Sequence, residues 1–326
     1  MPVYTREQGV GDRGDDRRTM LKYTIRRLLL LIPTMFFVAL ITFTLAKAAP
    51  GNPFDRNDAR PLSEATIARL NRLYGLDKPI HEQFVLFLGN AIRFDFGSSL
   101  VKDRSVNEII GQQFPVTAQL GIQALILALA ISLPLGVISA MKQNSAVDYA
   151  SLFFATIGYT IPSFVIGIFL IFLFAVTLKL LPIVGWGDLR HMILPTVVLA
   201  LGPAAFLTRL TRASMLDAIR QDYVRTARSK GLPEQMVIVT HVMKNAMIPI
   251  ATVIGPATAG LITGSFIVET LFSVPGIGRQ TILSIQQRDY PIIMATALLY
   301  AFLIALANLT VDLVYGVLDP RIKVGK

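Results

Sequence analysis

One stretch of the chain, residues 222–250, gathers basic side chains and a histidine in an otherwise apolar sequence. Its sequence, DYVRTARSKGLPEQMVIVTHVMKNAMIPI, separates two long apolar runs. The charged and titratable groups in it are Arg225, Arg228, Lys230, Lys244 and His241. Because they follow one another in helical register, they predict a functional helical surface. The alternative is a basic loop that only fixes membrane topology.

The pattern around these residues is that of two short helices joined at a glycine. Apolar side chains recur at helical spacing, opposite the basic ones, at Leu216, Ile219, Tyr223 and Ala227. Gly231 can supply the left-handed backbone with which helices commonly end, and Pro233 suits the first turn of a second helix. Such a pair of helices, projecting from a membrane, would fit a groove on a cytosolic protein.

The rest of the chain offers little for catalysis or metal binding. It has no cysteine, and His81, His191 and His241 lie far apart without HExxH spacing. Neither a GxxxxGK[ST] loop for nucleotide phosphates nor a Gly-x-Ser-x-Gly nucleophile motif occurs. We therefore expect no enzyme activity, no catalytic residue, no metal site and no cofactor in this chain.

Composition indicates a lipid bilayer as the surroundings. Of the 326 residues 53% are hydrophobic, and the mean hydropathy is +0.57, too apolar for a soluble protein of this size. The net charge of +10 comes from Lys and Arg between apolar runs, which is a topology signal and argues against nucleic acid as a partner. An all-α protein with six transmembrane helices is predicted, at 28–47, 116–140, 149–178, 192–208, 248–272 and 291–316. The third stretch has room for an irregular turn at 158–164.

The distribution of basic residues predicts the orientation. Lys and Arg concentrate in the N-terminal tail, after residue 316 and between the fourth and fifth spans, and such residues stay on the cytoplasmic side. We expect a multi-pass protein of the cytoplasmic (inner) membrane with both termini in the cytoplasm. The predicted parts are a disordered tail at 1–20, a first transmembrane helix at 21–48, an extracytoplasmic segment at 49–115, a five-helix core at 116–316 with a cytoplasmic loop at 209–247, and a tail at 317–326.

The interiors of spans two to six, taken as 116–140, 149–178, 193–208, 248–268 and 291–311, contain no Asp, Glu, Arg or His. Secondary transporters and proton pumps normally keep such a group inside the membrane, so ion coupling through a buried charge is not expected. If the protein moves a solute uphill, a partner must supply the energy.

At residues 222–250 the chain resembles a known family. DYVRTARSKGL followed by HVMKNAMIPI looks like the coupling motif of bacterial ABC importer permeases, in the version of the dipeptide/oligopeptide permease family. In the general motif Glu-Ala-Ala is followed by three residues and Gly; Ala227 and Gly231 match it, whereas Arg225 stands in place of Glu. From Leu21 on, further segments match that family's first permease subunit in order, namely RRLLLLIPTMFFVALITF, APGNP, YGLDKP, DFGSSL, HMILPTVVLALGP, ETLFSVPGIGRQ, RDYP and DLVYGVLDPRIK.

The resemblance implies a type I ABC importer permease fold within a larger assembly. The expected partners are a second homologous permease subunit, two P-loop ATPase subunits that bind ATP and Mg, and an extracytoplasmic substrate-binding protein. Closure of the ATPases would push the coupling loop and switch the bundle from inward-facing to outward-facing. The residues implied to couple are Asp222, Tyr223, Arg225, Ala227, Gly231 and Leu232.

Within this set the expected roles differ. Ala227 and Gly231 would allow close approach of the ATPase, and Arg225 would make a charge contact. Tyr223 and Leu232 would pack in the ATPase groove, with packing between the loop's own helices as the alternative.

A path for peptides needs polar but uncharged walls. The small polar residues of the fifth span, expected to face such a path, are Thr252, Thr258, Thr263 and Ser265; bonding to their own helix backbone is the alternative. Glu269 could contact substrate or the binding protein, or form a helix-end salt bridge. We expect import of di- or oligopeptides; the alternatives are import of oligosaccharides, nickel chelates or another solute, or a stand-alone channel or secondary carrier.

Overall fold

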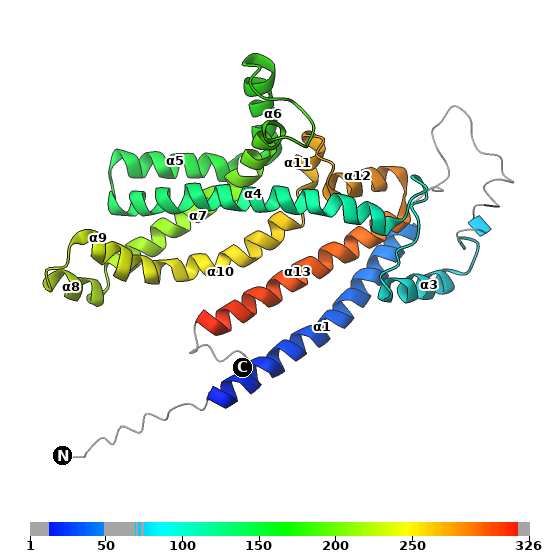
Figure 1. The fold of residues 1–326 in the computed structure, drawn as a ribbon, viewed down its shortest axis with the longest axis horizontal. Coiled ribbons are helices and arrows are strands. Elements are labelled where there is room, and N and C mark those ends of the chain that lie inside the picture. The colour runs from blue at the N-terminus through cyan, green and yellow to red at the C-terminus, as the bar shows by residue number, and fades with distance from the viewer. Residues whose placement is uncertain (1–12, 49–68, 70, 73–74, 319–326) are drawn as a thin grey trace.

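Helices make up nearly all of the structure, a computed structural model that describes residues 13–48, 69, 71–72 and 75–318. Five long helices run lengthwise through the molecule in Figure 1: α1 (Arg13–Ala48), α4 (Val106–Met141), α7 (Leu189–Ile219), α10 (Met243–Ile262) and α13 (Tyr290–Leu318). Five helices are long and apolar enough to cross a membrane, or six if a bent pair counts as one span. The predicted all-α membrane fold is confirmed.

The third predicted span is a bent pair. Its first half is α5 (Ala146–Thr160) and its second half is α6 (Ser163–Leu170), which continues into the wider turns of η1 (Ile171–Thr177). The two halves meet at 104°, and α6 stands out from the bundle in Figure 1. Because Pro162 has no amide hydrogen and disfavours helix in the preceding residue, the chain turns there, within the predicted irregular segment 158–164.

Two helices continue beyond the ends predicted from hydropathy. The loop expected from residue 209 begins as helix, because α7 runs on to Ile219. On the other side, α9 (Glu234–Met236) and η2 (Val237–Val242) lead directly into α10, so the predicted fifth span starts early. That span was also expected to reach residue 272 unbroken, but Gly264 at φ +90° separates α10 from α11 (Phe266–Leu271).

The tails and the segment before α4 complete the chain. The tail predicted to be disordered at 1–20 is helical from Arg13 on, and its first twelve residues lie outside the described part. Within 49–115 the structure describes α3 (Ile80–Ile92), and α4 already starts at Val106. The predicted tail at 317–326 belongs to α13 up to Leu318, and the rest lies outside the described residues.

Small residues bring the central helices into close contact. A Cβ atom at Gly121 of α4 would lie 2.3 Å from the carbonyl oxygen of Leu261 in α10. At Gly136 it would lie 2.5 Å from the Thr211 side chain in α7. Between these two points, alanines of α4 pack on alanines of α7. These contacts hold α4, α7 and α10 together as the core of the bundle, since small residues let helix backbones approach.

Candidate functional site

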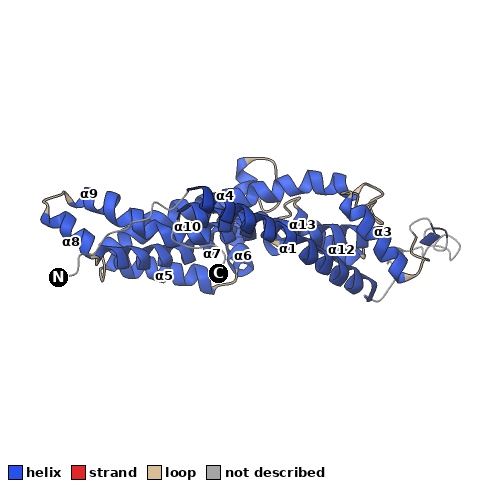
Figure 2. Ribbon diagram, turned by 90° about the horizontal axis from the view of Figure 1, so that it is seen from below, coloured by secondary structure: helices blue, strands red, loops and turns tan. Residues whose placement is uncertain are grey.

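The predicted coupling loop forms one end of the molecule. Figures 1 and 2 both place α8 (Asp222–Ser229) and α9 at the end opposite α3. The helix α8 ends at Gly231, whose φ of +76° is the left-handed conformation expected from the sequence. A Cβ atom added to Gly231 would meet nothing within 4 Å, so the backbone conformation, and not a lack of space, calls for glycine there.

The inner face of α8 is fixed to the bundle by apolar contacts. Val224 and Ala227 are buried and pack against side chains of α7 and η2, together with the partly buried Leu232. The methyl group of Ala227 thus lies in the chain's own core, and the expectation that Ala227 allows close approach of the ATPase stays a prediction. Leu232 follows the alternative that was left open, packing between the loop's own helices.

The buried stripe differs from the predicted one at three of its four positions. The residues in the core are Met215, Ala218, Val224 and Ala227, whereas the spacing pattern selected Leu216, Ile219, Tyr223 and Ala227. The pattern assumed one continuous helix, but the chain leaves α7 after Ile219 and starts α8 at Asp222. Val224 was missed for this reason; its spacing of three residues from Ala227 is the signal within α8.

The outer face of α8 is polar and open. The side chains of Asp222 and Arg225 are 97% and 76% exposed and lie 3.6 Å apart, and Tyr223 is also exposed. Arg228 makes two hydrogen bonds to Glu234, of 3.1 and 2.7 Å, across the turn at Gly231. A partner protein could therefore reach Asp222, Tyr223 and Arg225 without disturbing the packing of α8.

A buried ion pair lies behind this loop. Arg212 of α7 donates two hydrogen bonds to Asp148 of α5, of 2.6 and 2.7 Å. The same carboxylate accepts from the Ser139 hydroxyl of α4 at 2.5 Å and from the amide of Asn144. Asp148 precedes the predicted third span by one residue, so the expectation of uncharged span interiors holds within its stated limits, yet it missed this pair. The pair ties α4, α5 and α7 together next to α8.

The four small polar residues of the predicted path use their hydroxyl groups locally. Thr252, Thr258 and Thr263 each donate to a backbone carbonyl three or four residues earlier. Ser265 caps α11 by accepting from the amide of Val268. These are the local backbone bonds expected as the alternative, and the expectation that the four residues face a peptide path stays a prediction.

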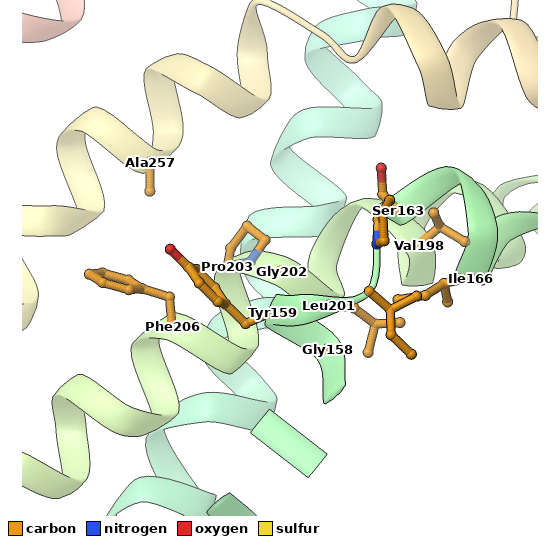
Figure 3. A pocket seen from close by; sticks show the side chains of 12 residues that line it. Gly158, Tyr159, Ser163, Ile166, Val198, Leu201, Gly202, Pro203, Phe206 and Ala257 are labelled. Carbon is orange, nitrogen blue, oxygen red and sulfur yellow. The ribbon is translucent and has the colours of Figure 1, made fainter. Parts of the chain in front are cut away.

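A pocket lies where the third span bends. It has a volume of about 390 Å³ and is bounded by the end of α5, the start of α6, α7 and Ala257 of α10 (Figure 3). The rings of Tyr159 and Phe206 line it, and the guanidinium of Arg209 lies 4.4 Å from the centre of the Tyr159 ring. An apolar pocket with an aromatic wall beside a cation can take an uncharged or weakly polar group.

At the α12 end of the molecule Glu269 is fully buried. It accepts hydrogen bonds of 3.0 Å from the Thr117 hydroxyl of α4 and the Arg279 amide of α12 (Ile277–Gln287). Gly276 and Gly278 approach the carboxylate closely. Among the described ion pairs none uses Glu269, so the expected helix-end salt bridge is not formed there; contact with substrate or the binding protein stays a prediction.

In the described part of the chain no group of three His, Cys, Asp or Glu side chains could hold a metal ion. The polar groups at both ends of the bundle instead bond to one another and to backbone.

Comparison with known proteins agrees with the resemblance to ABC importer permeases. Two family models match, "Binding-protein-dependent transport system inner membrane component" at residues 132–324 and the corresponding N-terminal model at 20–121. The chain is 43% identical to the dipeptide transport system permease protein DppB of Bacillus subtilis, covering 94% of this chain and 99% of that one. It is 41% identical to the oligopeptide transport system permease protein OppB of Salmonella typhimurium, covering 93% and 100%.

Solved structures share the fold at low sequence identity. An amino acid ABC transporter chain superposes with a TM-score of 0.51 at 17% identity, over 66% of this chain and 94% of that one. A chain of the MetNI methionine ABC transporter gives 0.51 at 14% identity, over 65% and 96%. The chain thus belongs to the family of binding-protein-dependent transport system inner membrane components, the permease subunits of ABC importers.

Proposed function

We propose that this chain is one of two permease subunits of an ATP-driven importer for short peptides. The names of its relatives, dipeptide and oligopeptide transport permeases, support the substrate class. Both termini and α8 would face the cytoplasm, and α3 and α12 the outside. The relatives indicate the substrate class by similarity. The alternative substrates are oligosaccharides, nickel chelates or another solute.

The expected partners are those of ABC importer permeases, the family to which the chain belongs. Two P-loop ATPase subunits would bind ATP and Mg, and one of them would take the exposed face of α8 into a groove. Asp222, Tyr223 and Arg225 supply this face, while Gly231 sets the turn that presents it. A second, homologous permease would complete the membrane bundle, and an extracytoplasmic binding protein would deliver the peptide.

The observation that carries the proposal is the division of α8 into two faces. Val224 and Ala227 anchor it to α7 and η2, and the opposite face is open. A push on the open face would therefore move α7, and the Asp148–Arg212 pair would carry α4 and α5 along. Rigid-body movement of this kind is how packed helices change state.

A stand-alone channel or secondary carrier would have no use for such a helix. Affinity purification of the full-length chain in mild detergent from its native membranes, followed by mass spectrometry, separates the two classes. Recovery of a P-loop ATPase and a second multi-span permease is expected. Recovery of the chain alone or as a homo-oligomer, under conditions that preserve other membrane complexes, would contradict the proposal.

A further inference from the structure

Two glutamines stand on one face of a membrane-spanning helix. Gln119 and Gln123 lie four residues apart on α4, and so project in the same direction. Gln119 is exposed and Gln123 is partly buried. Primary amides are costly in hydrocarbon unless they are hydrogen-bonded, so this face of α4 needs a polar neighbour.

The neighbours within the chain satisfy these amides poorly. The side-chain nitrogens of Gln119 and Gln123 both donate to the Met192 sulfur, at 3.7 and 3.5 Å. A thioether is a weak acceptor. The Gln123 carbonyl accepts from the Thr196 hydroxyl at 3.3 Å, a long bond. Most of the hydrogen-bonding capacity of the two amides is therefore left for another molecule.

The two glutamines open into a pocket of about 530 Å³ between α4 and the start of α7, here named the amide pocket. Asp188 and Arg190 lie on its wall, next to Met192. The backbone amide and the ring of His191 hold the pKa of Asp188 below its usual value, so this carboxylate is ionised at neutral pH. Among the described ion pairs none uses Arg190.

We propose that the amide pocket binds the backbone of a short peptide, with Gln119 and Gln123 pairing to its peptide groups and Asp188 and Arg190 facing its charged ends. The inference rests on the proposed function and names the residues that meet the substrate. The amide pocket is proposed as the peptide-binding site in place of the four hydroxyl residues Thr252, Thr258, Thr263 and Ser265. The hydroxyl groups of these four residues bond locally.

The spacing and chemistry of the pocket fit this ligand. A primary amide offers both donors and an acceptor, which match the carbonyl and amide groups of a peptide unit. Four residues of helix rise by about 6 Å, and an extended chain repeats its same-side groups about every 7 Å. Charges of both signs suit a molecule that carries an ammonium and a carboxylate. A neutral sugar carries no formal charge to match Asp188 and Arg190.

The absence of cysteine from the chain makes a direct test possible. Gln119→Cys and Gln123→Cys variants are expressed separately with the partner proteins, and membrane fragments open on both faces are treated with a charged thiol reagent. Trialanine is added at graded concentrations, up to those that saturate uptake by the same cells, and free alanine serves as the ligand control. Ile126→Cys is the matched position, because Ile126 lies on the same helix, is 62% exposed and is apolar.

We expect the reagent to modify the cysteine at both glutamine positions. Trialanine should slow this modification and alanine should not. The cysteine of Ile126→Cys should stay unmodified with or without trialanine. Failure of the reagent to reach either position would overturn the inference, and so would modification that trialanine leaves unchanged. Peptide uptake by cells with the unmodified chain is measured in parallel. If uptake is ATP-dependent while protection is absent, only the amide pocket is wrong; if no peptide is taken up, the proposed function itself fails.

Discussion

At the scale of single residues, backbone conformation and burial separate the roles of the coupling residues. Gly231 is fixed by its φ of +76°, and Ala227 by its burial, whereas Arg225 has neither constraint. The resemblance to the importer motif placed all three in one group. It could not tell which of them face a partner, because the turn between α7 and α8 changes the helical register.

Gly231→Val should lower peptide uptake by about tenfold or more, since a β-branched residue in the left-handed region costs about 1–2 kcal/mol and would displace the turn. Gly231→Asn is the matched control, because Asn tolerates that conformation. Uptake is measured alongside the amount of assembled complex. Equal uptake by both variants, with normal assembly, would count against the role of the turn.

Arg225→Ala and Ala227→Leu should fail in different ways. Arg225→Ala should weaken recovery of the ATPase on purification and leave the thermal stability of the chain unchanged. Ala227→Leu should lower stability by about 1–3 kcal/mol, because extra methylenes in a packed core force it apart. Thermal unfolding in detergent and co-purification are the two measurements. A stability loss from Arg225→Ala would refute the division of α8 into two faces.

Thr258→Val removes a hydroxyl that bonds to the carbonyl of Ile254 in its own helix. Uptake should therefore stay within about twofold of the unmodified protein, the range of a neutral substitution. A large fall in the affinity for peptide, with normal expression, would restore Thr258 to the path.

At the scale of elements, the Asp148–Arg212 pair links α5 to α7, and Ser139 of α4 bonds to the same carboxylate. Hydropathy predicted where the helices cross the hydrocarbon, but not where they end, because a helix continues into water whenever its side chains find partners. Arg212 lies in such a continuation and finds Asp148. The position of the bend at Pro162 could be predicted from the sequence. Its angle could not be predicted, because it depends on the packing of α6.

Removing one partner of a buried pair leaves an uncompensated charge. Arg212→Gln should lower the free energy of unfolding by about 3 kcal/mol, the low end for such pairs, since Arg212 keeps 19% exposure. The double variant Arg212→Gln with Asp148→Asn should be more stable than Arg212→Gln alone. A double variant that is less stable, by thermal unfolding of the purified complex, would show that the two groups do not act as a pair.

At the scale of the whole molecule, the two ends of the bundle differ in whether their polar side chains are exposed or buried. The α8 end has the exposed face that is proposed to dock a partner, and the α12 end encloses Glu269 between residues 117 and 276–279. Residues so far apart in sequence share no local pattern, so this contact could not be predicted from the sequence. The number of spans could be predicted from the sequence, because each span needs about 20 apolar residues.

The central claim is that partner ATPases drive peptide movement through this chain. The most direct measurement is uptake of a labelled short peptide by proteoliposomes that contain the purified complex, with the binding protein and peptide on the outside. Uptake should require ATP on the ATPase side and should persist when ionophores abolish all ion gradients. Uptake without ATP, or uptake that ends when the ion gradients are abolished, would contradict the account.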